Sequence, residues 1–232
     1  MVSFFLDQSN IAQLPKGTPY LELTIFDGAD AIGKTVGKYT AVNGDVVFEV
    51  TALQALSQYA GSKFGLDEFA FNTTDPLAMF RTANFQLPNN WTVSMGPRNA
   101  DGYGKFELLP MTNGANNMQT PLWFVITNIT GDSASTYQEI STGNAGQGNT
   151  DFAAHVINFS VQGASSAWFG GQTPTPVPLP GDVWLLLSGL CGLVVSGRRS
   201  LPRLTKLRPP SSRAFADQAP QNELTALLQP CA

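Results

Sequence analysis

The sequence predicts an all-β domain, an antiparallel β-sandwich or jelly roll, followed by a single C-terminal transmembrane helix. Three observations lead to this prediction. Short apolar or alternating runs recur along residues 1–170, turn-forming residues separate them, and one strongly apolar stretch stands alone nearer the C-terminus. Short runs with period-two alternation are typical of strands buried on one side, and many of them at close spacing favour a sandwich.

Seven segments of the body are predicted strands, and one is a predicted helix. In the segment 20–26, the side chains of Leu21, Leu23 and Ile25 fall on one face because successive strand side chains alternate. Turn dipeptides such as Asn43-Gly44 separate the runs. Only Thr51–Ala60 fits a short helix. The predicted strands are Tyr20–Phe26, Val46–Val50, Glu68–Asn72, Trp91–Met95, Lys105–Leu109, Leu122–Thr127 and His155–Val161.

Charge and cysteine content exclude several classes of function. Residues 1–176 carry 14 acidic and seven basic side chains, which is a net charge of −7. Such a body is unsuited to binding nucleic acid, whose phosphates attract clustered Lys and Arg. The two cysteines, Cys191 and Cys231, lie outside the body. The body at 1–169 therefore has neither a disulfide framework nor a cysteine-based metal site.

Beyond residue 169 the chain divides into a linker, a membrane anchor and a tail. Residues 170–180 contain alternating prolines, which favour an extended and exposed linker. The strongly apolar segment Gly181–Gly197, of 17 residues, would form a helix of about 25 Å, short for a bilayer core of about 30 Å but able to span it. Trp184 suits one membrane interface and Arg198-Arg199 the cytoplasmic side; a buried core helix is the alternative. Residues 200–232 are basic and without periodicity, and we expect a disordered cytoplasmic tail or the product of readthrough.

The sequence around this anchor also resembles a known sorting signal. Val177-Pro178-Leu179-Pro180, a glycine-bearing apolar stretch and Arg198-Arg199 follow one another in that order. This order resembles the C-terminal signal of the PEP-CTERM family in its VPLPA variant. That signal combines a proline-containing recognition motif, a short transmembrane helix and an arginine cluster. The matching anchor residues are Trp184, Leu185, Leu186, Leu187, Gly189, Leu190, Gly192, Leu193, Arg198 and Arg199.

The resemblance implies a partner, a processing reaction and a destination. The partner would be an exosortase, a membrane-embedded cysteine transpeptidase of Gram-negative bacteria that cuts near the motif and discards the helix. The protein would lie in the cell membrane or envelope before cleavage. Afterwards it would lie at the cell surface or outside the cell, near exopolysaccharide. The first residues, Met1–Asp7, have no basic n-region, so the sequence as printed predicts no signal peptide of its own.

Residues 28–35 match the phosphate-binding pattern G-x-x-x-x-G-K-[ST]. That motif needs a helix directly after it, because the helix N-terminus and its amides hold the phosphates. Here two glycines and several β-branched residues follow Thr35, which makes a poor helix. A glycine-rich hairpin loop is therefore the favoured interpretation, and nucleotide binding the minor one.

His155 is the only histidine, and a Ser–His–acid triad or a zinc site would have to use it. On the predicted strand it shares a face with Ile157 and Phe159. No nucleophile elbow and no cluster of metal ligands accompanies it in the sequence, so a structural role is favoured. The sequence predicts no metal and no cofactor.

Three acidic residues are candidates for the carboxylate pair of a glycoside hydrolase. Asp67-Glu68 would have to meet Glu107 at a set separation, which the sequence does not reveal. Adjacent acids on a regular strand point to opposite faces. Solvated turn and strand acids are therefore favoured over a catalytic pair.

Three tryptophans are candidate glycan contacts. Trp91, Trp123 and Trp168 would form a sugar-stacking platform on one face of the sandwich, although such residues more often pack in a core or at its rim. Three hypotheses follow. The first is a non-enzymatic envelope or matrix protein sorted by an exosortase. The second is a carbohydrate-binding module anchored in the same way, and the third is a secreted hydrolase.

Overall fold

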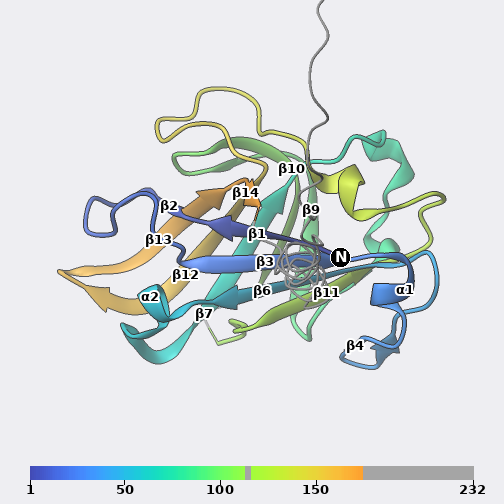
Figure 1. Cartoon of the computed structure of the whole chain (residues 1–232), viewed down its shortest axis with the longest axis horizontal. Helices are drawn as coiled ribbons and strands as arrows, with labels where there is room; N and C mark the ends of the chain where they lie inside the picture. Colours follow the sequence, from blue (N-terminus) through green and yellow to red (C-terminus); the bar gives the residue numbers. More distant parts are fainter. Residues whose placement is uncertain (113–115, 175–232) are drawn as a thin grey trace, which may run out of the picture. The chain divides into compact units, whose positions relative to one another are not determined.

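A computed structural model describes residues 1–112 and 116–174, which belong to a compact unit spanning Met1–Val177 (Figure 1). The pairings between its strands are antiparallel, and its helices are single turns. The predicted all-β class is therefore confirmed for this part of the chain. The sorting motif Val177–Pro180, the anchor 181–199 and the tail 200–232 lie outside the described residues. Among the described residues, no helix has the length and apolar character that crossing a membrane requires.

Twelve strands form two six-stranded sheets. The first sheet has the order β14–β1–β3–β6–β11–β8, and the second has the order β2–β13–β12–β7–β10–β9. The strands of the first sheet are Thr173–Pro174 (β14), Val2–Leu6 (β1), Leu21–Phe26 (β3), Val46–Ala52 (β6), Leu122–Ile126 (β11) and Phe85–Gln86 (β8). Those of the second are Gln8–Ser9 (β2), Ala164–Gly171 (β13), Phe152–Val161 (β12), Ala60–Phe71 (β7), Gly104–Thr112 (β10) and Trp91–Ala100 (β9).

The remaining elements are short and lie in the connections. Strands β4 (Thr35–Val36) and β5 (Tyr39–Thr40) pair with each other as a separate small hairpin. The α-helical turns are α1 (Gly28–Ala31) and α2 (Gln54–Ser57), and the 3₁₀ turns are η1 (Leu77–Met79), η2 (Thr82–Asn84) and η3 (Ala134–Tyr137).

The two sheets face each other across one main core. Phe48 of the first sheet stacks on Phe124 of the same sheet, with ring centroids 4.5 Å apart, and on Phe71 of the second, at 5.2 Å. Phe69 and Tyr137 complete this aromatic cluster. Figure 1 shows β1, β3, β6 and β11 as one layer and the strands of the second sheet as another. Burial of large rings from both layers holds the sheets together.

A second, smaller apolar cluster lies on the outer face of the first sheet. Phe26 of β3, Val47 of β6 and Val125 of β11 turn outward and are buried beneath the hairpin β4–β5. Val36 and Ala41 pack against them from above. The chain from residue 28 to residue 45 therefore covers part of a sheet face that would otherwise be exposed.

Each of the seven predicted strands overlaps an observed strand. The predicted helix Thr51–Ala60 shrinks to the single turn α2, because β6 extends to Ala52 and β7 already begins at Ala60. The predicted boundary between body and linker, at 169/170, falls inside strand β13. Gly170 and Gly171 pair with Ala153 and Phe152 in the sheet.

The start of the predicted linker is thus part of the domain. Thr173 and Pro174 add a short edge strand beside β1, where they pair with Phe5 and Phe4. A proline is tolerated there because an edge strand has one side without ladder hydrogen bonds. Pro174 of this strand is the last described residue, three residues before Val177.

Candidate functional site

A groove of about 560 Å³ lies beside the hairpin β4–β5. One wall is the hairpin itself, from Lys34 to Gly37, and the other is formed by the loops 88–90 and 116–121. We call this cavity the amide groove, because five carboxamide side chains line it: Asn89, Asn90, Asn116, Asn117 and Gln119.

Trp123 gives the amide groove an aromatic surface. It lies on β11 with an outward side chain, half-buried, and lines the groove. Its ring is stacked parallel to Phe26, with centroids 6.0 Å apart and an angle of 5° between the planes. The ammonium of Lys34 lies 3.6 Å from the Phe26 centroid and 5.7 Å from that of Trp123. These contacts hold the ring in one orientation.

Hydrogen bonds fix the loop wall of the groove. The indole N–H of Trp91 donates to the carbonyl of Asn117 at 2.8 Å, and the side chain of Asn90 donates to that of Asn117 at 3.2 Å. The backbone of Gln119 exchanges two hydrogen bonds with Leu66 of β7. The amide groups are therefore carried on a wall that is tied to both the core and the second sheet.

The predicted tryptophans do not form one platform. Trp91 is 8% exposed and belongs to the main core, and Trp168 of the same sheet is 8% exposed within a separate apolar cluster. Neither offers an open ring face to a ligand. Trp123 is the one of the three that lines a groove, and Trp91 supports that groove from behind.

The phosphate-binding pattern at 28–35 does not adopt the geometry of that motif. The helical turn α1 lies inside the pattern, at Gly28–Ala31, and a strand follows Lys34 instead of a helix. Lys34 contacts aromatic rings and lines the amide groove. The favoured interpretation, a glycine-rich hairpin loop at 28–35, is only partly met: this segment is a helical turn that leads into the first strand of the hairpin, and the hairpin turn itself lies at Gly37-Lys38.

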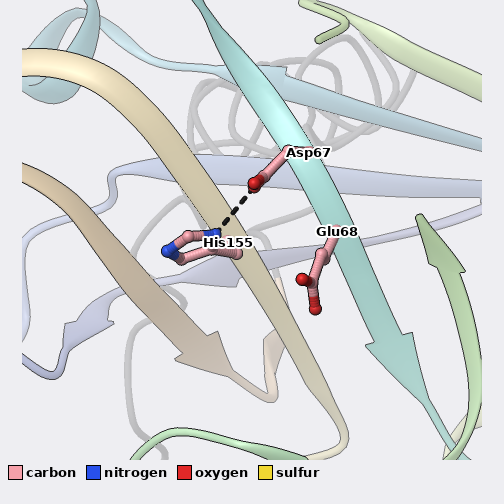
Figure 2. A group of neighbouring side chains, drawn as sticks. All are labelled: Asp67, Glu68 and His155. Atoms are coloured by element: carbon pink, nitrogen blue, oxygen red, sulfur yellow. Dashed lines mark hydrogen bonds and ion pairs between the residues drawn. The ribbon is translucent and has the colours of Figure 1, made fainter. Parts of the chain in front are cut away.

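A second group of side chains gathers on the outer face of the second sheet. Asp67 and Glu68 of β7 and His155 of β12 place one potential ligand atom each within 4.8 Å of one another. Figure 2 shows both carboxylates on the same side of β7, beside the imidazole of the neighbouring strand. Nδ1 of His155 lies 2.8 Å from Oδ1 of Asp67. We call these three residues the His–acid cluster.

A β-bulge creates this cluster, and the expectation that Asp67 and Glu68 point to opposite faces is wrong. His155 pairs with Glu68, but the next residue of β12, Val156, pairs with Leu66. Asp67 is thus an extra residue in β7, and two residues oppose one on the partner strand. Leu66 and Phe69 on either side are both buried in the main core. The two acids between them share the outer face.

The face predicted for His155 also needs correction. Ile157 does share its outward face, but Phe159 is buried in the main core on the opposite side. The reason is a second irregularity of β12, between Ile157 and Phe159, where Asn158 has a positive φ of 62°. The strand loses its strict alternation there, which a two-residue period does not foresee.

Burial and neighbouring charge set the electrostatics of the cluster. Burial raises the pKa of Glu68 above its ordinary value, and the adjacent Asp67 carboxylate raises this pKa further. His155 and Arg98 act in the opposite direction. The side chains of His155 and Asp67 are about one-fifth exposed, at 21% and 20%. The cluster is therefore partly shielded but open to small solutes.

Glu107 does not join Asp67 and Glu68. On the paired strands β7 and β10, Glu68 lies opposite Met111, which places Glu107 four residues along β10. At about 3.3 Å per residue this is roughly 13 Å, beyond the separation that glycoside hydrolysis uses, at most about 9.5 Å. Glu107 instead lines a small cavity of about 140 Å³ with Glu139, whose charge helps raise the pKa of Glu107 after the larger effect of burial.

Sequence reasoning named Trp123 and left the rest of the amide groove unrecognised. The loops that carry its amides lie far apart in the chain, and Asn-rich loops are too common to be a signal. No protein-family model, curated protein or solved structure matches the chain.

Proposed function

We propose that this chain is a non-enzymatic cell-envelope or extracellular-matrix protein with a β-sandwich or jelly-roll body that binds oligosaccharide in the amide groove. Delivery to the surface would use the C-terminal sorting signal, the exosortase and the membrane anchor that the sequence resemblance implies. This proposal combines two hypotheses from the sequence: an envelope or matrix protein sorted by an exosortase, and a carbohydrate-binding module anchored in the same way. Two facing antiparallel sheets with a shared core support the sandwich.

The observation that carries the binding function is the combination of Trp123 with carboxamides in one groove. A pyranose ring has apolar C–H faces and a rim of hydroxyl groups. The apolar face stacks on an indole ring, while carboxamides offer both donors and acceptors to hydroxyls. The amide groove presents Trp123 with five carboxamides around it. It carries one lysine and no carboxylate among its lining residues, which favours a neutral or weakly acidic sugar chain.

The size of the groove supports an oligosaccharide. Small-molecule sites in proteins span about 300–1,000 Å³, and the amide groove has about 560 Å³. A second depression of about 360 Å³ adjoins it and shares Val36, Gly37 and Asn89 with it. A chain of several sugar units would follow the two depressions along the hairpin.

A glycan array followed by calorimetry tests this function. We expect the full chain to bind a subset of glycans, and Trp123→Ala to weaken binding at least tenfold because the stacking surface is lost. Asn89→Ala should weaken binding without affecting the fold, because Asn89 is exposed. Tyr59→Ala removes an aromatic ring that is 39% exposed and lies outside the groove, and it should bind like the wild type. Equal glycan affinity of all four proteins would contradict the proposal.

A further inference from the structure

The His–acid cluster has a composition that suits a metal ion. We propose that Asp67, Glu68 and His155 form a binding site for one Zn²⁺ ion on the outer face of the second sheet. This site lies on the sheet opposite the one that carries Trp123, so it is independent of the proposed glycan binding.

The first argument is the geometry of the donor atoms. One imidazole nitrogen and one oxygen from each carboxylate already lie within 4.8 Å of one another. Around a tetrahedral zinc ion with bonds of about 2.0–2.2 Å, such donors are separated by about 3.3–3.6 Å. Rotations of the partly exposed side chains close this difference. The strands themselves need not move.

The second argument is the way the backbone assembles the group. A regular strand would send Asp67 and Glu68 to opposite faces. The bulge at Asp67 turns both carboxylates toward His155 while Leu66 and Phe69 remain in the core. Bulges often aim side chains at functional positions. Here the bulge concentrates two negative charges beside the chain's only histidine.

The third argument is charge. Two carboxylates share a partly buried place beside a single imidazole. Holding two like charges together under partial burial is unfavourable. A divalent cation would offset both charges at once and would bind a neutral imidazole at the same time.

The donor set selects the kind of metal. Calcium and magnesium take oxygen ligands, often with several waters, whereas an imidazole nitrogen with carboxylates suits zinc. Three protein ligands leave a fourth position of the tetrahedron for water. His155 is also oriented in advance, because its ring packs on Trp168 with centroids 5.2 Å apart. The neighbouring indole is itself 8% exposed, so it restricts the movement of the imidazole.

The test uses untagged full-length protein, freed of metal with a chelator and carrying Cys191→Ala and Cys231→Ala to remove other soft ligands. Because His155 is the only histidine, NMR of histidine-labelled protein reports on this site alone. We expect Zn²⁺ to shift the imidazole signals with 1:1 stoichiometry. Calcium at the same concentration should leave them unchanged. At a Zn²⁺ concentration of about 100 times Kd, thermal unfolding should move upward by roughly 5–10 °C.

Variants separate the site from binding elsewhere. Glu68→Gln keeps the size of the side chain and should lower Zn²⁺ affinity at least tenfold, and His155→Ala should abolish the stabilisation. Glu107→Gln is the matched control, because that carboxylate lies in another cavity, and it should bind Zn²⁺ like the wild type. Unchanged imidazole signals at saturating Zn²⁺, or equal affinity of Glu68→Gln and Glu107→Gln, would overturn the proposal. Should His155→Ala fail to fold, Glu68→Gln and the NMR titration still decide.

Discussion

At the scale of single residues, Asp132 shows how a buried carboxyl makes stability depend on pH. It accepts a hydrogen bond of 2.6 Å from the hydroxyl of Tyr137 and one of 2.8 Å from the backbone N–H of Ser133. Burial nevertheless outweighs both hydrogen bonds and raises the pKa of Asp132 to about 6. The folded state is therefore more stable when the carboxyl of Asp132 is protonated than when it is ionised.

The sign of the effect follows from the direction of this shift. The folded-state pKa, about 6, lies above the ordinary value of 3.8. Between these values the folded protein binds more protons than the unfolded chain, so the free energy of unfolding falls as the pH rises. The contribution of Asp132 is fully present below pH 3.8 and is lost as the pH rises through about 6.

We predict that Asp132→Asn reduces this pH dependence, because an amide does not titrate. From pH 4 to pH 7, the free energy of unfolding should fall by up to about 2.5 kcal/mol more in the wild type than in the variant. Urea unfolding at several pH values measures the difference. Asp101→Asn, at an exposed turn, is the control and should follow the wild-type profile. Parallel profiles for Asp132→Asn and the wild type would contradict the prediction.

At the scale of elements, Gly171 of β13 packs directly against strand β1 of the first sheet. A Cβ atom built on this residue would lie 2.1 Å from the carbonyl oxygen of Phe5 and 2.6 Å from Cα of Leu6. Gly171 is buried and pairs with Phe152. Only a residue without a side chain lets β1 and β13 approach this closely.

We predict that Gly171→Ala destabilises the domain by about 2–4 kcal/mol, because backbone atoms have to move apart to admit the methyl group. The matched control is Gly146→Ala, whose added Cβ meets nothing within 4 Å and whose φ is not positive. This control should change stability by less than about 0.5 kcal/mol. Chemical denaturation of both variants compares them; equal stability would show that β1 and β13 adapt.

The main strands were predictable from the sequence, and the short edge strands were not. All seven predicted strands overlap observed ones, since alternation and turn residues are local signals. The short edge strands β2, β8 and β14, of two residues each, have no pattern of their own and depend on their neighbours. The bulge at Asp67 was not foreseeable either, because it comes from the register between β7 and β12.

At the scale of the whole molecule, the proposed delivery of the body depends on residues beyond the two sheets. The described fold ends at Pro174, and the motif Val177–Pro180 follows after two residues. The body carries a net charge of −7 over residues 1–176, which keeps it away from anionic lipid surfaces.

We predict that protein released from the cell surface lacks Val183–Ala232. Intact-mass measurement, with and without the sorting enzyme, checks this directly. Pro178→Ala together with Pro180→Ala should reduce release, because the recognition motif is altered. Pro176→Ala changes the same proline-rich stretch just before the motif and should be processed normally. A released protein whose mass still includes Val183–Ala232 would reject processing.

The sequence by itself determined the all-β class, the positions of the main strands and the acidic character of the body. These properties depend on local alternation, turn residues and composition, which act over a few residues. Only the tertiary structure decided that Trp123 lines a groove while Trp91 and Trp168 are buried. It also decided that Asp67 and Glu68 meet His155. Both outcomes depend on pairing between strands far apart in the chain, and one extra residue in a strand redirects the side chains on one side of it.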